Sequence, residues 1–245
     1  MSALIPDEAA ETHLYFVRHG QAVVNVTGVM GGPRGDTGLT VLGRAQAVRL
    51  RDRLSTGEIR ADVLLASSLL RARETAEIIA PALGLPVLPD DDLQEFRVGP
   101  EGDGLSRDEY TRRFGWTDIV ANPFTPVDPC GESWARFMLR VGETITRIAA
   151  EYRGKTVVLL CHGGVIEGSF VHFFGMNAHE FPRVRFHTMN TSLTHWSYHR
   201  RVTNDNQHEN LAWRLGYYND TRHLSGLDAT AFSPPAAPVP TEPSP

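Results

Sequence analysis

The stretch His13-Leu-Tyr-Phe-Val-Arg-His-Gly-Gln-Ala-Val-Val-Asn25 decides the fold of this chain. Its residues 14–17 form a short apolar run rich in strand-forming types, which predicts a buried strand of an α/β sheet. Arg18, His19 and Gly20 follow directly. They supply a cation with a planar fork of donors, a nucleophile or base near neutral pH, and a backbone that can turn sharply. This combination suits the binding of a phosphate group.

A second stretch repeats this arrangement. Thr156-Val-Val-Leu-Leu-Cys161 is the clearest buried strand, and it ends in His162, Gly163 and Gly164. Residues 62–67 read as a further buried strand. Ligands of open α/β sheets bind beyond the carboxyl ends of the strands, so we expect the residues after these strands to share one crevice.

Apolar spacing and capping residues indicate the remaining elements. Thr40 is expected to cap one helix, and Ser67 or Ser68 another that contains Arg71 in its first turn. A cation there opposes the helix dipole unless an anion lies beside it. The expected helices cover residues 40–54, 67–83, 106–114, 132–152 and 165–174, and the expected minor strands cover residues 86–89, 185–198 and 210–218.

Bulk properties limit the function classes. The chain has 245 residues, 41% of them hydrophobic, with a formal net charge of -5, which favours one large α/β domain and argues against general nucleic-acid binding. No run approaches the roughly 18 apolar residues of a membrane span, and the acidic opening lacks a secretion signal, so we expect no membrane association and a cytoplasmic location. Cys130 and Cys161 form neither a disulfide framework nor a metal-binding pattern.

Composition also divides the chain. We expect a tail at residues 1–11, one domain at 12–227, and a Pro- and Ala-rich disordered tail at 228–245. Within the domain, residues 98–131 carry many glycines and prolines and predict a lid-like excursion that shapes substrate access. The oligomeric state stays open, a homo-oligomer included.

The predicted crevice suggests a reaction. Arg18 and Arg71 can clamp phosphate oxygens, and His162 and the backbone N–H near Gly163 can add donors. His19 is then placed to attack phosphorus through Nε2 or Nδ1, which gives a phosphohistidine that water hydrolyses. This reaction requires a ring that solvent can reach.

The leaving oxygen needs a proton, and Glu95 is the preferred general acid, with Glu101 as its rival. A metal site explains the sequence less well. His195 and His199 are four residues apart in a predicted strand, about 13 Å along it, which is too far to share one ion. We therefore expect neither a metal nor a cofactor.

Taken together, these motifs resemble the histidine phosphatase, or phosphoglycerate mutase-like, family. The similar segments run in family order from residue 13 to about residue 198. They are Val17-Arg18-His19-Gly20-Gln21 with Asn25, Leu39-Thr40 with Gly43 and Gln46-Ala47, Ser67-Ser68-Leu69-Leu70-Arg71-Ala72 with Thr75-Ala76, Leu93-Gln94-Glu95, Gly131-Glu132-Ser133, and Cys161-His162-Gly163-Gly164-Val165-Ile166.

The resemblance implies a three-layer α/β/α sandwich around a mainly parallel sheet and metal-independent chemistry. It implies that His19 accepts the phosphoryl group and that Glu95 donates the proton. It also implies that Gln21 contacts the substrate. The phosphate pocket that it implies consists of Arg18, Asn25, Arg71 and His162.

Two departures from the family pattern bear on the activity. Many members have Trp-Glu-Gly after the acid, whereas this chain has Pro100-Glu101-Gly102, which leaves the choice between Glu95 and Glu101 open. The long insertion of the mutases has no clear counterpart in residues 98–131. The sequence therefore favours a histidine acid phosphatase-type phosphomonoesterase that hydrolyses a small phosphorylated metabolite. The alternatives are a cofactor-dependent phosphoglycerate mutase and a catalytically silent module that binds phosphorylated ligands.

Overall fold

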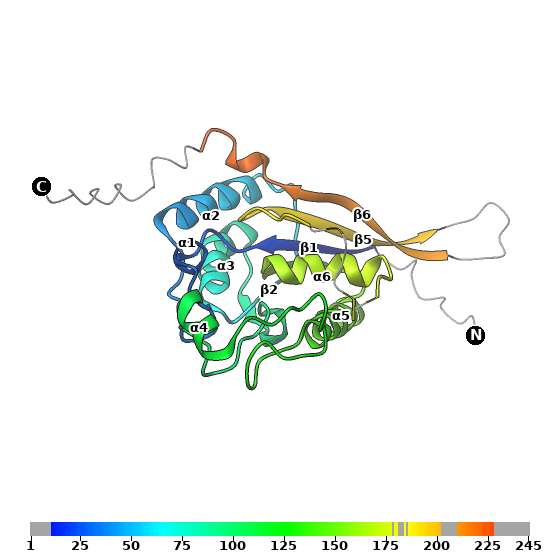
Figure 1. Ribbon diagram of the computed structural model, residues 1–245. Coiled ribbons are helices and arrows are strands. Elements are labelled where there is room, and N and C mark those ends of the chain that lie inside the picture. Colours follow the sequence, from blue (N-terminus) through cyan, green and yellow to red (C-terminus); the bar gives the residue numbers. More distant parts are fainter. Residues whose placement is uncertain (1–10, 178, 181–183, 185, 202–209, 228–245) are drawn as a thin grey trace, which may run out of the picture.

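A six-stranded sheet forms the centre of the computed structural model (Figure 1). The structure describes residues 11–177, 179–180, 184, 186–201 and 210–227. In spatial order the strands are β3 (Val87–Pro89), β2 (Val63–Ala66), β4 (Thr156–Cys161), β1 (Thr12–Arg18), β5 (Leu193–Arg201) and β6 (Asn210–Asp220). The four strands from β3 to β1 pair in parallel, and β5 and β6 extend the sheet antiparallel.

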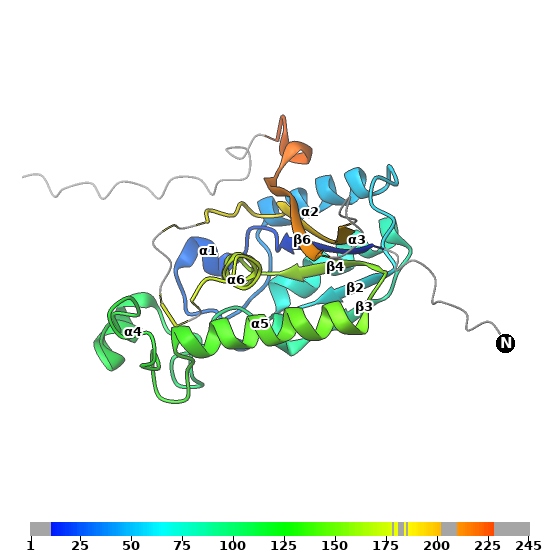
Figure 2. The same cartoon turned by 90° about the vertical axis from the view of Figure 1, so that its right-hand side faces the viewer.

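Helices cover both faces of this sheet, which confirms the predicted three-layer sandwich. One face carries α2 (Val41–Leu54) and α3 (Leu70–Leu83), and the other carries α5 (Trp134–Glu151) and α6 (Gly163–Phe173) (Figures 1 and 2). The short helices α1 (Val23–Thr27) and α4 (Arg107–Phe114) and the 3-10 turns η1 (Asp91–Leu93) and η2 (Arg222–Leu224) lie in the connections.

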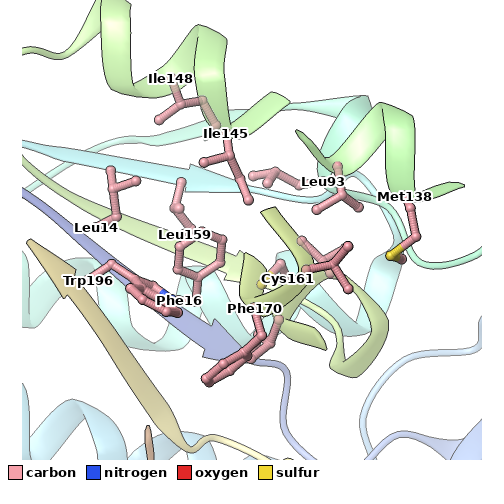
Figure 3. Close-up of a cluster of buried hydrophobic side chains, with 14 of the residues drawn as sticks. Leu14, Phe16, Leu93, Met138, Ile145, Ile148, Leu159, Cys161, Phe170 and Trp196 are labelled. Carbon is pink, nitrogen blue, oxygen red and sulfur yellow. The ribbon is translucent and has the colours of Figure 1, made fainter. Parts of the chain in front are cut away.

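The central strand β4 joins two apolar cores, because its side chains alternate between the faces of the sheet. Leu159 and Cys161 pack with residues of α5 and α6, and Val158 and Leu160 pack with residues of α2 and α3. Figure 3 shows the larger core, in which Leu159 lies among residues from the other strands and helices. The continuous apolar run in the sequence reflects burial on both sides.

Two helix boundaries agree with the predicted helix starts. Thr40 accepts a hydrogen bond from the Gly43 amide, and Ser106 and Glu109 form a reciprocal capping box at α4. The capping prediction for the helix containing Arg71 was wrong. Its N-cap is Leu69, without a side-chain cap.

Two further elements differ from the sequence prediction. The strand predicted at residues 185–198 begins at Leu193, because residues 186–192 form irregular structure in which the Thr191 amide donates to Arg18 O at 3.0 Å, at the end of β1. Residue 185 lies outside the described residues. Helix α1 was not predicted, since its five residues are too few to show helical spacing.

The predicted excursion at residues 98–131 contains one helix, α4, between η1 and α5. The first part of this excursion is hydrogen-bonded to the segment that connects β1 with α2. The Met30 amide donates to Leu105 O at 2.9 Å, and the Gly104 amide donates to Met30 O at 2.9 Å. The predicted C-terminal tail and most of the N-terminal tail lie outside the described residues. Within the described ranges, no helix combines the length and apolar character that crossing a membrane requires.

Truncating the central core tests this architecture. Leu159→Ala is expected to lower the free energy of unfolding by about 2–5 kcal/mol, because it leaves a cavity between β4 and its neighbours. Urea titration followed by circular dichroism measures the change. Leu139→Ala on the exposed face of α5 is the matched control, with an expected change below about 0.5 kcal/mol. Equal changes in the two variants would contradict the assigned core.

Candidate active site

Two histidines meet where β1 and β4 end. Arg18 and Cys161 are the last partners of the parallel ladder, and the His19 amide donates to Cys161 O at 3.0 Å. His19 and His162 are the next residues of the two segments, and their ring centroids lie 5.0 Å apart. The predicted convergence of these histidines is therefore present in the structure.

The His19 ring is oriented by two contacts. Its Nδ1 lies 2.7 Å from Gly20 O, and because a carbonyl only accepts, Nδ1 carries the proton. Nε2 keeps its lone pair and accepts from Arg71 Nε at 3.2 Å. His19 is 2% exposed, so the expectation that solvent reaches this ring was wrong: the ring is buried, and the Arg71 guanidinium packs against its Nε2. Nε2 is the ring nitrogen that carries the lone pair, and the Arg71 guanidinium covers it.

Arg71 is the second residue of α3 and has a buried carboxylate beside it. Asp36 Oδ2 accepts from the Arg71 amide at 3.1 Å and from Arg71 Nη1 at 2.9 Å. Nη1 also donates to Gly31 O at 3.0 Å. Asp36 is the anion that a cation in the first turn needs. It holds Nη1 on one side, which leaves Nε directed at His19.

His162 is oriented by Ser67, which follows β2. Ser67 Oγ lies 2.8 Å from His162 Nε2, and a hydroxyl that donates there leaves the ring proton on Nδ1. Among the described residues, the buried His162 Nδ1 and the buried Nε of Arg18 have no hydrogen-bond partner. Arg18 Nη1 donates to Thr188 O, and Gly163 lies against the Arg18 guanidinium. Buried donors without partners are expected where a ligand completes the site.

Burial sets the protonation of both rings. It lowers the pKa of His19 well below the usual value, and the neighbouring Arg71 and Arg18 cations lower it further. Burial is also the largest cause that lowers the pKa of His162 well below the usual value, and Arg71 and His19 lower it further. Both imidazoles are therefore uncharged at neutral pH. Burial also raises the pKa of the Cys161 thiol, which keeps it protonated.

Glu95 belongs to the loop after η1, and its side chain contacts the N-terminus of α6. Its Oε2 accepts from the Gly164 amide at 3.0 Å, its Oε1 accepts from the Phe96 amide at 3.0 Å, and a side chain at Gly164 would overlap Oε1. Burial lowers the pKa of Arg18, and Glu95 acts in the opposite direction. Glu95 lines a cavity of about 380 Å³ together with Gly31, Gly32, Pro33, Arg34, Leu69, Gln94, Phe96, Arg97, Val98, Pro100, Asp103 and Cys130.

Glu101, the alternative general acid, lies outside the cavity that Glu95 lines. Glu101 is exposed and forms an ion pair with Arg113 on α4, and it is absent from the lining of the Glu95 cavity. The geometry therefore favours Glu95 over Glu101 as the residue that reaches a substrate.

Two predicted site residues have their side chains engaged in the loop after β1. Asn25 is exposed, and its Oδ1 accepts from the Ala22 amide at 2.9 Å. Gln21 Oε1 accepts from the Thr40 hydroxyl at 2.8 Å. In the described part of the chain, neither side chain is hydrogen-bonded to the two arginines or the two histidines of the site.

Sequence reasoning missed two residues that orient the site, Asp36 and Ser67. Asp36 was not singled out as a site residue in the sequence, although the cation predicted in the first turn at Arg71 was a signal that an anion lies nearby. Ser67 read as a helix cap. Among the residues that the structure describes, no group of three or more His, Cys, Asp or Glu side chains is arranged to hold a metal ion.

A family model, the histidine phosphatase superfamily (branch 1), matches residues 14–208 of this chain. The chain belongs to the histidine phosphatase superfamily. Superfamily relatives include both mutases and phosphatases. A 2,3-bisphosphoglycerate-dependent phosphoglycerate mutase of Methylobacterium sp. is 31% identical over 73% of this chain and 88% of its own length. A metal-independent phosphoserine phosphatase of Arabidopsis thaliana is 29% identical over 67% of this chain and 69% of its own length.

The fold is shared with solved structures of the superfamily. The mycobacterial glucosyl-3-phosphoglycerate phosphatase, solved with VO3, superposes with a TM-score of 0.65 at 26% identity. The match covers 84% of this chain and 98% of that chain.

Acid should destabilise the fold through these histidines. Each buried ring has a folded-state pKa below its unfolded value near 6.5, so the unfolded chain binds more protons as the pH falls through about 6.5. Between pH 7.5 and 5.5, one such histidine is expected to remove about 1.4 kcal/mol of stability. Urea titrations at both pH values measure the free energy of unfolding. Between the two pH values, His19→Gln should lose less of this free energy than the wild type, by about that amount. His179→Gln, at an exposed position, should keep the loss of the wild type. An unchanged loss in His19→Gln would contradict a neutral, buried ring.

Proposed function

We propose that this protein is a metal-independent phosphomonoesterase that hydrolyses a small phosphorylated metabolite through a phosphohistidine intermediate. The observation that carries the proposal is the geometry of His19, whose Nε2 lone pair lies next to Arg71 within a cluster of buried donors. A neutral imidazole surrounded by cationic and N–H donors suits attack on an anionic phosphoryl group.

Substrate binding must first uncover the nucleophile. Arg71 Nε now donates to His19 Nε2, so a phosphate oxygen must take over this donor as the ester enters. The Arg18 Nε and His162 Nδ1 donors supply further bonds to the phosphate oxygens. These charges stabilise the transferring phosphoryl group in its transition state.

In the first chemical step, His19 Nε2 forms a bond to phosphorus while the bond from phosphorus to the ester oxygen breaks. The leaving oxygen takes the proton of the Glu95 carboxyl group, which becomes a carboxylate. The product alcohol departs, and the phosphoryl group stays on Nε2.

In the second step, water attacks the phosphohistidine. The Glu95 carboxylate accepts a proton from this water as its oxygen bonds to phosphorus, and the bond from phosphorus to nitrogen breaks. Inorganic phosphate leaves, and both His19 and Glu95 return to their starting protonation states. The second step therefore resets the enzyme without a cofactor.

The leaving alcohol would occupy the cavity beside Glu95. Its lining combines apolar groups with the cations Arg34 and Arg97 and the acidic residues Glu95 and Asp103, which favours a polar alcohol portion. The phosphatase relatives named above act on phosphoserine and on glucosyl-3-phosphoglycerate, and both names fit such a group.

A chelator-resistant phosphatase assay tests the proposal. Wild-type protein in EDTA should hydrolyse p-nitrophenyl phosphate, and it should also release phosphate from a panel of phosphoserine, 3-phosphoglycerate and sugar phosphates. His19→Ala should lower kcat by roughly four orders of magnitude or more, because it removes the nucleophile. Rapid acid quench and mass spectrometry should locate a phosphoryl group on His19 of the wild type.

His179→Ala is the control at an exposed histidine. Undiminished turnover in His19→Ala would falsify the proposal. Binding of inorganic phosphate without turnover of any ester would support the silent binding module instead.

The mutase relative gives the second candidate a specific basis, so it needs its own experiment. With 3-phosphoglycerate and a trace of 2,3-bisphosphoglycerate, phosphorus NMR should show inorganic phosphate as the main product, because residues 98–131 lack the mutase insertion. Accumulation of 2-phosphoglycerate faster than phosphate would establish the mutase.

A further inference from the structure

A buried arginine is hydrogen-bonded to the backbone around Glu95. Arg140 of α5 is 9% exposed, and its guanidinium donates to three backbone carbonyls of this segment. Nη1 donates to Asp92 O at 2.7 Å and to Gln94 O at 2.9 Å, and Nη2 donates to Glu95 O at 3.1 Å. One side chain therefore satisfies the carbonyls on the N-terminal side of the acid and the carbonyl of the acid itself.

Glu132 completes this arrangement from the other side. Its two carboxylate oxygens accept from Arg140 Nε at 2.7 Å and from Nη2 at 2.8 Å. Oε2 also accepts from the Arg97 amide at 2.9 Å, and the Glu132 amide donates to Arg97 O at 2.8 Å. The ion pair thus fixes the backbone on both sides of Glu95.

Stability alone does not account for this ion pair. A buried salt bridge is often no more stabilising than apolar residues of the same volume, because both charges lose their hydration. What the planar fork of arginine adds is geometry, since its five donors can fix several acceptors at once. Here the acceptors run from the 3-10 turn η1 into the loop that lines the cavity.

We propose that Arg140, held by Glu132, is a positioning residue that sets the Glu95 carboxyl group for proton transfer to the leaving oxygen. The inference rests on the proposed function, because it requires Glu95 to be the general acid. A displacement of about 1 Å can cost 10²-fold in rate, so release of the backbone should slow the steps that need the proton.

Esters with different leaving groups distinguish a residue that positions the general acid from one that only supports the fold. Nitrophenolate leaves as a stable anion without a proton, whereas an aliphatic alkoxide requires one. Glu95→Gln should therefore lower kcat/KM, which reports the first chemical step, by roughly 10²–10⁴-fold for the fastest aliphatic ester of the panel and far less for p-nitrophenyl phosphate. Arg140→Lys keeps the charge opposite Glu132 but loses the fork. It should reproduce this selectivity, with a roughly 10–100-fold loss for the aliphatic ester and less than about threefold for p-nitrophenyl phosphate.

Two further variants sharpen the experiment. Arg147→Lys alters an arginine of the same helix, which pairs with Asp90 at the surface, and should leave both rates unchanged. In Glu95→Gln, adding Arg140→Lys should cause almost no further loss, because the acid that Arg140 positions is already absent. If circular dichroism shows that Arg140→Lys is unfolded, Glu132→Gln replaces it in the same comparison.

Equal losses for both esters, or no loss for either, would overturn the positioning role while leaving the phosphatase proposal intact. Failure of the wild type to hydrolyse any ester would instead overturn the proposed function. The two failures are therefore distinguishable.

Discussion

The parallel pairing of β1 with β4 is the constraint on which the candidate site depends. Arg18 lies opposite Cys161, so both strands end at one level and the next residues, His19 and His162, lie side by side. A register shift by one residue would turn the buried side chains to the opposite face of the sheet. The apolar cores on the two faces therefore fix the register, and the register places the histidines.

A site assembled in this way gathers basic groups where water is scarce. Its electrostatic cost is limited by keeping both imidazoles uncharged and by placing Asp36 against Arg71 and Glu95 near Arg18. The cluster still holds buried donors that the described residues do not satisfy. An anion of the size of phosphate would supply the missing hydrogen bonds.

Buried carboxylates fasten the loops around this cluster. Asp103 accepts from the Arg34 and Gly35 amides at 2.7 and 2.8 Å, and Asp128 accepts from the Gly99 amide at 2.6 Å. Glu132 does the same for Arg97. Loops lack the repeating partners of helices and strands, so their buried N–H groups need acceptors from side chains. These buried acidic residues thus shape the walls of the cavity.

The sequence by itself determined the layered α/β fold, the strands at β1, β2 and β4, and the candidate groups Arg18, His19, Arg71 and His162, because apolar runs and their following residues are local features. Only the tertiary structure decided which nitrogen of His19 keeps its lone pair, which of Glu95 and Glu101 reaches the cavity, and which partners hold them. Those answers depend on Asp36, Ser67 and Arg140, whose contacts join segments that are between 35 and 95 residues apart in the chain. No local pattern encodes such contacts, since they arise only when the packed cores bring the strand ends and loops together.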